Sequence, residues 1–223
     1  MNLTAETTVG SVATEHPLAT RVFARHGIDF CCGGGLPLAE ACATKGADID
    51  AVLAELSAEI DAAPEEEVRW DQAPLQELIE HILRRHHDKL KEELPRLEAM
   101  CRKVHEVHGA KDPERFDALW KTFSAVKTDI DQHLPKEEQV LFPAILAGHK
   151  HMLGGPISVM EMEHDQLGGM LRELRRLTDG YRVPEGACNT WRALWAGLEE
   201  LEADLHEHIH LENNILHKRA FSG

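Results

Sequence analysis

The chain lacks any run of about twenty apolar residues, the length that a membrane-spanning helix needs. Residues 1–10 also lack the basic start and the apolar segment of a secretory signal peptide. We therefore expect a soluble protein that stays in the cytoplasm and has no membrane partner.

Cysteines are few and odd in number, and basic residues are scarce. Five cysteines in 223 residues argue against a disulfide framework and fit a reducing compartment. Lys and Arg number 24 against 39 Asp and Glu, which gives a formal net charge of −15. Nucleic-acid interfaces are led by Lys and Arg, so this balance argues against a nucleic-acid partner.

Aromatic residues are also scarce, at 5%, and apolar residues recur at helical rather than alternating spacing. The pattern predicts an all-α fold. We expect a small helical domain over residues 1–63, a charged linker bracketed by prolines over 64–74, and a larger domain over 75–223. In the larger domain four helices are predicted, and their short connections favour an up-down-up-down bundle: 75–108, 113–148, 156–179 and 186–218.

Two motifs with the spacing HxxxE suggest chemistry inside this bundle. His133 and Glu137 lie one helical turn apart, and so do His208 and Glu212. A buried carboxylate or imidazole needs a partner or a metal. One such motif is most often a core histidine bonded to a glutamate, but two inward motifs favour a metal site. Residues expected on the apolar face of the first motif are Val126, Ile130, Val140, Leu141 and Ala144.

The other two helices each offer one more histidine. His164 shares a face with apolar residues, while Asp165 points away. In the first helix, counting from the preceding apolar residues favours His86. The internal repeat favours His87, because His87-Asp88 matches His164-Asp165, and we choose His87.

The predicted ligands are four histidines and two glutamates: His87, His133, Glu137, His164, His208 and Glu212. Six ligands are too many for one tetrahedral zinc, and four nitrogens are too many for magnesium or calcium. The set suits two iron ions with an oxo or hydroxo bridge, with Glu137 and Glu212 bridging and two histidines on each iron. An outer shell of acceptors should surround them.

A pair of adjacent cysteines, Cys31-Cys32, precedes three glycines. Backbone N–H groups of a glycine-rich turn can favour a reactive or metal-binding thiolate. A free cysteine is equally often a small buried hydrophobe, so both interpretations stay open. The other three cysteines are expected to be packing residues: Cys42, Cys101 and Cys188.

The sequence resembles the RIC proteins, the di-iron proteins for repair of iron centres, over nearly its full length. The motifs that carry the resemblance are DFCCGG, HHDKLKEELP, HLPKEEQVLFP, GPISVMEMEHD and HIHLENNIL. The resemblance implies a hemerythrin-like four-helix bundle behind a small helical domain. It also matches the six predicted ligands, including His87, to the family's di-iron ligands, and Cys31-Cys32 to its cysteine pair. One departure is His217-Lys218, where the repeat of Phe142-Pro143 leads us to expect Phe-Pro.

By this resemblance the protein repairs iron-sulfur clusters damaged by nitric oxide or oxidative stress, so its partners would be damaged iron-sulfur proteins and nitric oxide. The thiols of Cys31 and Cys32 would hold iron in transit or exchange nitrosyl groups. Two alternatives are a protein that binds and buffers nitric oxide, linked to denitrification, and a nitric oxide reductase. Whether the protein is an enzyme, and whether it forms a homodimer, the sequence leaves open.

Overall fold

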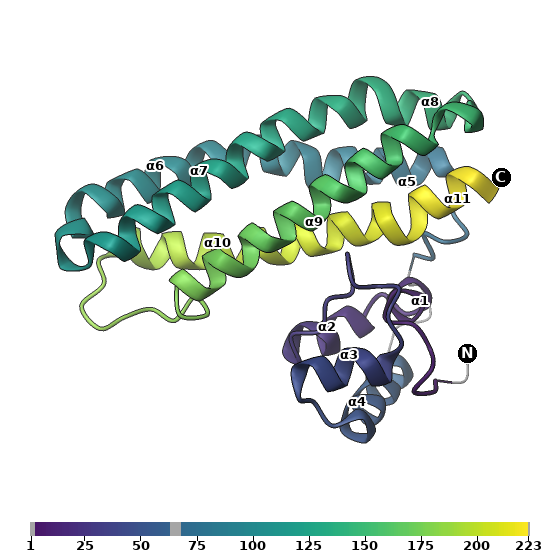
Figure 1. The fold of residues 1–223 in the computed structure, drawn as a ribbon, viewed down its shortest axis with the longest axis horizontal. Helices are drawn as coiled ribbons and strands as arrows, with labels where there is room; N and C mark the ends of the chain where they lie inside the picture. Colours follow the sequence, from purple (N-terminus) through teal and green to yellow (C-terminus); the bar gives the residue numbers. More distant parts are fainter. Residues whose placement is uncertain (1–2, 63–67, 223) are drawn as a thin grey trace. The chain divides into compact units, whose positions relative to one another are not determined.

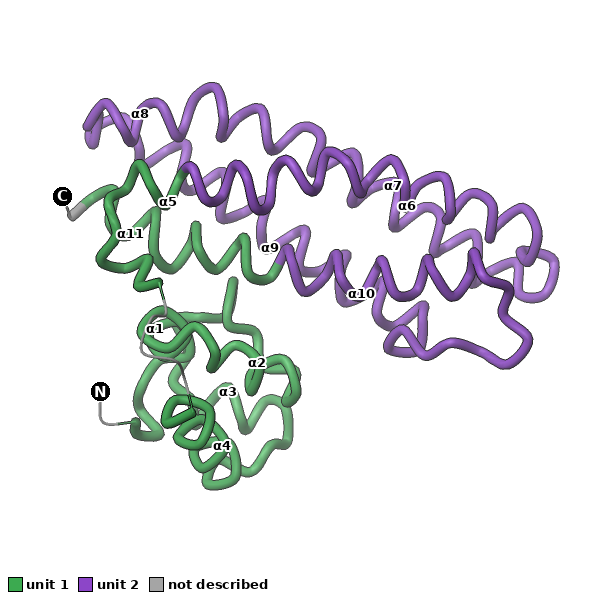
Figure 2. The backbone as a smooth tube through the Cα atoms, turned by 180° about the vertical axis from the view of Figure 1, so that it is seen from behind, with its two compact units in different colours: residues 1–79, 206–223 green, residues 80–205 purple. Residues whose placement is uncertain are grey.

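Helices account for the regular structure of the chain. The computed structural model describes residues 3–62 and 68–222, and none of these residues belongs to a strand, although Thr8 and Pro37 form an isolated bridge. The all-α prediction is confirmed. The chain divides into two compact units, residues 1–79 with 206–223 and residues 80–205 (Figure 2).

Four short helices form the N-terminal part of the first unit: α1 (Val9–Glu15), α2 (Ala19–Arg25), α3 (Leu38–Lys45) and α4 (Ile49–Asp61). The Asp48 side chain caps α4 by accepting a hydrogen bond from the Asp50 N–H at 3.0 Å. Gly46 ends α3 with a φ of 65°, which favours glycine. Their apolar faces share one core that includes Val12, Phe23, Leu38, Val52 and Leu56.

The predicted linker over 64–74 falls partly outside the described residues, at 64–67. In its described part, Arg69 forms an ion pair with Asp71 at 2.8 Å. The carbonyl of Trp70 accepts a hydrogen bond from Arg219, in α11 (His217–Ser222), at 2.6 Å. The predicted domain boundaries remain predictions.

Four long helices run side by side in the second unit: α6 (Asp88–His108), α7 (Pro113–Lys136), α9 (Gly154–Leu177) and α10 (Asn189–His210), the last as far as residue 205 (Figure 1). Helix α7 packs against α6 and α9. Arg175 joins α9 to α10 through Glu202 at 2.6 Å. Helix α10 approaches α6 closely at Gly197, where a Cβ would lie 2.6 Å from Cδ2 of Leu97. The predicted four-helix bundle is confirmed.

Three segments of these helices are π-helical: η1 (Leu83–His87) between α5 (Leu75–Ile82) and α6, η3 (Glu137–Leu141) between α7 and α8 (Phe142–Leu146), and η5 (Leu211–Leu216) between α10 and α11. Their closing hydrogen bonds run from the N–H groups of Asp88, Phe142 and His217 to the carbonyls of Leu83, Glu137 and Glu212. Single π turns are frequent at functional sites. Each of the three contains a predicted ligand.

Candidate metal centre

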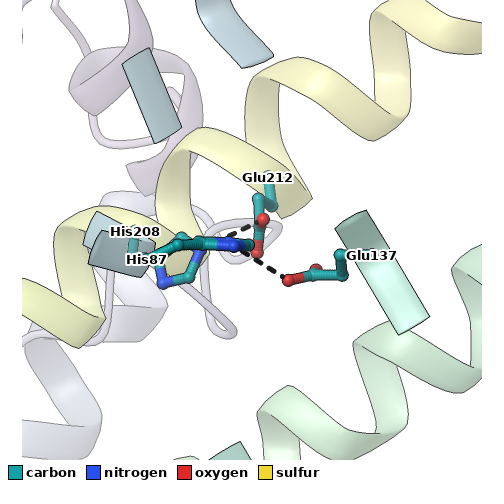
Figure 3. Close-up of side chains that lie close together, drawn as sticks. All are labelled: His87, Glu137, His208 and Glu212. Atoms are coloured by element: carbon teal, nitrogen blue, oxygen red, sulfur yellow. Dashed lines mark hydrogen bonds and ion pairs between the residues drawn. The ribbon is translucent and has the colours of Figure 1, made fainter. Parts of the chain in front are cut away.

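Six buried side chains form two overlapping groups of ligand type. One consists of His87, Glu137, His208 and Glu212 (Figure 3), and the other of His133, Glu137, His164 and Glu212. In each group one ligand atom per residue lies within 4.8 Å of the others. Each group has two imidazoles, and Glu137 and Glu212 belong to both. The six residues are those that the sequence predicts as ligands.

In both HxxxE motifs the histidine and the glutamate lie next to each other, as the spacing predicts. His133 Nε2 lies 3.1 Å from Glu137 Oε1, and His208 Nε2 lies 3.1 Å from Glu212 Oε1. Both glutamates are fully buried. Burying a carboxylate costs several kcal/mol unless a charge or a metal compensates, so this arrangement favours a bound cation.

An outer carboxylate orients His133. Its Nδ1 donates to Glu163 Oε2 at 2.8 Å, and Lys136 holds the other oxygen of Glu163 at 2.5 Å. Burial raises the pKa of Glu163, but the hydrogen bonds from Lys136 and His133 outweigh burial, and the pKa is lowered. The proton on Nδ1 leaves the Nε2 lone pair of His133 directed into the group, as a metal ligand requires.

His87 is oriented in the same way. Its Nδ1 donates to Glu138 Oε1 at 2.9 Å, and Lys91 pairs with that oxygen at 2.7 Å. Burial raises the pKa of Glu138, yet the bonds from Lys91 and His87 bring it below its usual value. On the inner side, His87 Nε2 lies 3.4 Å from Glu137 Oε2. The outer shell of acceptors that the sequence predicts therefore takes the form of two Lys–Glu pairs.

The donor set fits a transition metal. His164 Nε2 lies 3.1 Å from His133 Nε2, and the Nδ1 hydrogen bond of His133 makes its Nε2 an acceptor. Four imidazole nitrogens and two carboxylates are ligands that iron accepts, whereas magnesium and calcium prefer oxygen alone. Because both groups share Glu137 and Glu212, the residues fit two ions close together.

His86 is fully buried but belongs to neither group. Its Nδ1 lies 3.3 Å from Asp204 Oδ2, and Arg85 and Lys89 bind the other oxygen of Asp204 at 2.7 and 2.9 Å. Burial raises the pKa of Asp204, but hydrogen bonds from His86 and Lys89 lower it to about 2 overall. The structure thus brings His87, and not His86, to the other predicted ligands.

The cysteine pair lies in a turn organised by Asp29. Oδ1 of Asp29 accepts hydrogen bonds from the backbone N–H groups of Cys31, Cys32 and Gly33 at 3.0 to 3.1 Å, and from Cys31 Sγ at 3.2 Å. The turn's N–H groups therefore stabilise the carboxylate rather than a thiolate. The hydrogen bond with Cys32, burial and the Asp29 charge raise the pKa of Cys31 well above its usual value. Asp29, Cys31 and Cys32 still form a third group of ligand type.

The other three cysteines differ from one another in their exposure to solvent. Cys42 and Cys101 are buried, as expected for packing residues. Cys188 is exposed, and its Sγ lies 3.3 Å from His108 Nε2, so the packing interpretation is wrong for this residue.

Asn214, which sequence reasoning missed, holds the cysteine turn against η5. Its Nδ2 donates to Cys31 O at 2.9 Å and to Phe30 O at 3.2 Å. Its amide fits between two glycines, since a Cβ on either Gly10 or Gly34 would lie 2.6 Å from Asn214 Oδ1. The sequence does show an asparagine after the second HxxxE motif and a run of glycines after the cysteine pair. Neither pattern indicates that the asparagine contacts the glycines.

Comparison with known proteins agrees with this geometry. The profile described as hemerythrin HHE cation binding domain matches residues 78–220, and that of ScdA_N, a domain of unknown function (DUF542), matches residues 5–60. The iron-sulfur cluster repair protein YtfE of Yersinia pseudotuberculosis serotype IB (strain PB1/+) is 46% identical over 215 residues, which cover 96% of each chain. The YtfE protein of Yersinia pestis (strain Pestoides F) gives the same identity and coverage. The chain belongs to the YtfE family.

Membership of the YtfE family confirms the resemblance that the sequence motifs indicate. The match to the hemerythrin profile confirms the predicted hemerythrin-like fold. The matched cation-binding domain contains all six ligand-type residues, and the DUF542 match contains Asp29, Cys31 and Cys32. Among the described residues, no helix is long and apolar enough to cross a membrane.

Proposed function

We propose that this chain is a non-haem di-iron protein that repairs iron-sulfur clusters damaged by nitric oxide or oxidative stress. The observation that carries the proposal is the pair of buried groups sharing Glu137 and Glu212, in a chain 46% identical to iron-sulfur cluster repair proteins. Damaged iron-sulfur proteins are then its clients. We place it in the cytoplasm, where the thiols of its five cysteines stay reduced.

Each group would hold one iron, with Glu137 and Glu212 as bridging carboxylates and an oxo or hydroxo bridge between the metals. Two bound irons would supply exchangeable ferrous ions and redox chemistry to a client. Glu163 and Glu138 keep the ring protons of His133 and His87 on Nδ1, so that each Nε2 stays available as a ligand. Lys136 and Lys91 keep these outer carboxylates ionised and fixed.

Cys31 and Cys32 would form a second, softer binding site for iron or a nitrosyl group in transit. Thiolates are the ligands that iron-sulfur chemistry uses. Because the raised pKa keeps the Cys31 thiol protonated, metal binding there releases a proton and is favoured as the pH rises. Asp29 supplies the third ligand atom, and its carboxylate accepts the hydrogen bonds that shape the turn.

Metal analysis and Mössbauer spectroscopy test the centre. Protein made with iron available should hold about two irons per chain, as the two shared groups require. A Glu137→Gln variant should lose iron from both groups, because Glu137 belongs to both. A single iron, or stoichiometric zinc under these conditions, would refute the assignment.

An anaerobic assay tests the function. Reduced, iron-loaded protein is mixed with nitric oxide and an iron-sulfur enzyme that nitric oxide has inactivated. Bound nitrosyl, released iron, nitrous oxide and recovered enzyme activity are then measured together. Repair predicts that iron leaves the protein while the enzyme recovers. Bound nitrosyl without iron loss, or sustained production of nitrous oxide, would replace repair by nitric oxide buffering or reduction.

A further inference from the structure

A thiol and an imidazole from two different helix ends form a close pair outside the metal centre. Cys188 is exposed, and its Sγ lies 3.3 Å from Nε2 of His108. Among the described residues, neither of the two belongs to a group of ligand type, and neither takes part in the proposed repair. A thiol hydrogen-bonded to an imidazole is the arrangement that activates a cysteine nucleophile, because the ring takes the thiol proton.

The pair lies where the end of α6 meets the start of α10. His108 is the last residue of α6. Cys188 directly precedes α10, and its carbonyl accepts the hydrogen bond of the Arg192 N–H at 3.0 Å. The C-terminal end of a helix favours a positive charge, and the N-terminal end favours a negative charge. Both helix ends therefore favour transfer of a proton from Cys188 Sγ to His108 Nε2.

Packing fixes the imidazole of His108 in this position. His108 is only 8% exposed, and its ring centroid lies 4.8 Å from that of Trp191, which in turn lies 5.2 Å from the ring of Phe116. Nδ1 of His108 is buried and has no hydrogen-bond partner in the part of the chain that the structure describes. A hydrolytic triad needs a third group at that atom to orient the ring. The pair thus suits a single proton transfer at Nε2 rather than hydrolysis.

Basic side chains lie on both sides of the pair. Lys111 ends the short helix η2 (Gly109–Lys111) that directly follows His108, and its Nζ lies 5.8 Å from the centre of the Trp191 ring. Arg192 follows Cys188 by one helical turn, and its Nε donates to the Ala187 carbonyl at 3.1 Å. Two cations near an exposed thiol, on a chain of net charge −15, favour a reactant that carries carboxylates.

We propose that Cys188 is a site of reversible thiol modification, which exchanges with a small disulfide carrying carboxylates and uses His108 as its base. His108 Nε2 takes the proton, and the Cys188 thiolate attacks one sulfur of the disulfide. The disulfide bond of the reactant breaks, its electron pair leaves with the other sulfur, and that thiolate takes the proton from His108. Cys188 is thereby oxidised to a mixed disulfide, and half of the reactant is reduced to a thiol. The inference does not depend on bound iron.

Oxidised glutathione is the probe, because it is a small disulfide with carboxylates. The full-length protein is incubated with it at about pH 7 and quenched in acid at intervals, and peptide mass spectrometry follows the mixed disulfide at Cys188. The exposed Cys188 should react before the buried Cys42 and Cys101. His108→Gln keeps a polar side chain but provides no base, so it should slow the reaction at least about tenfold. His105→Gln is the matched control, about one turn earlier in α6, where His105 pairs with Asp117 at 2.6 Å.

Repeating the measurement at about pH 10 separates proton transfer from access. An ordinary thiol is ionised there without a base, so wild type and His108→Gln should react at equal rates. Lys111→Gln tests the charge without changing the pair itself. It should slow the reaction with oxidised glutathione about threefold at low salt, and leave the reaction with the uncharged disulfide of 2-mercaptoethanol unchanged. Circular dichroism checks that each variant is folded.

An unmodified Cys188 in the wild type, a wild-type rate in His108→Gln, or equal slowing in His105→Gln would overturn the proposal. Slowing of His108→Gln that persists at about pH 10 would show that the ring governs access to the thiol, and would overturn its role as a base. Equal effects of Lys111→Gln on the two disulfides would overturn the preference for carboxylates. None of these outcomes bears on the di-iron centre, which the metal analysis tests separately.

Discussion

Replacing Gly34 by alanine tests how the cysteine turn is held against η5. A Cβ at Gly34 would lie 2.6 Å from Oδ1 and 3.0 Å from Nδ2 of Asn214, and 3.0 Å from Phe30 O. These separations are shorter than van der Waals contact in a packed interior. We therefore expect the Asn214 amide to be displaced from its place between Gly10 and Gly34.

The magnitude follows from the contacts that are lost. Asn214 Nδ2 would give up its hydrogen bonds to Cys31 O and Phe30 O, at 2.9 and 3.2 Å. At about 0.5–1.5 kcal/mol each, the two bonds amount to roughly 1–3 kcal/mol, and overpacking adds about 1 kcal/mol. Gly34→Ala should lower the free energy of unfolding of the first unit by about 2–4 kcal/mol.

Urea unfolding gives the free energy of unfolding, and hydrogen exchange of the amides in 30–34 and 211–216 locates the change. Gly35→Ala is the matched control in the same turn. Its Cβ would meet no atom within 4 Å. We expect that variant to be neutral, or more stable by up to about 1 kcal/mol because alanine restricts the unfolded chain.

A double-mutant cycle decides whether the explanation is correct. In an Asn214→Ala background the amide is gone, so adding Gly34→Ala should cost about 1 kcal/mol or less. Equal costs of Gly34→Ala in both backgrounds would show that something other than Asn214 opposes the methyl group. The account of Asn214 held between two glycines would then be wrong.

Three further predictions concern the two neighbouring histidines, the thiols and the pH dependence. His87→Ala should lose iron and His86→Ala should keep most of it, as measured by metal analysis; the reverse would show that counting along the apolar face was the better guide. A Cys31→Ser, Cys32→Ser double variant should keep the di-iron spectrum but restore less activity to a damaged iron-sulfur enzyme, and full recovery would return the pair to a packing role. Because the folded pKa of Asp204 is about 2, below its ordinary value of 3.8, its carboxylate should stabilise apo-protein above about pH 4, and this contribution should disappear as the pH falls towards 2. Circular dichroism should show a shallower loss of stability over that range in Asp204→Asn, and identical pH profiles would contradict the assignment.

The fold and the gathering of the ligand-type residues follow from local sequence rules. HxxxE places two side chains on one face of any helix, and apolar residues at helical spacing turn that face inward. Leu194, Leu201, Leu205, Ile215 and Leu216, which share the face of the second motif, are all buried. The boundaries of the four helices predicted over 75–218 agree with the observed ones to within a few residues.

Counting by 3.6 residues fails where the helix is not an α-helix. Val140 was expected on the apolar face but is 57% exposed, because it lies in the π-helical segment η3. The conflict between His86 and His87 has the same cause, since both lie in η1 and both are fully buried. Nothing in the residue types marks a π turn, so periodicity alone could not resolve either position.

The contact of the cysteine turn with η5 could not be predicted either. Phe30 and Asn214 are separated by 184 residues, and the hydrogen bond between them uses a backbone carbonyl, which every sequence offers. The predicted boundary between the domain over 1–63 and the domain over 75–223 rested on the charged linker. The structure adds that residues 206–223 share a compact unit with residues 1–79.

The π-helical turn η3 has a consequence for insertions and deletions. Its closing bond joins Phe142 N–H to Glu137 O, five residues apart, where an α-helix would need four. Deleting Val140 would remove an exposed side chain and no core contact. It would also return the segment to α-helical closure, because the same Phe142 N–H and Glu137 O would then be four residues apart. Phe142 and Ile145 would therefore stay in the core, and His133 and Glu137 would stay in place. Position 140 should accept a deletion, whereas a deletion within the α-helical part of α7 would rotate every later residue by about 100° about the helix axis.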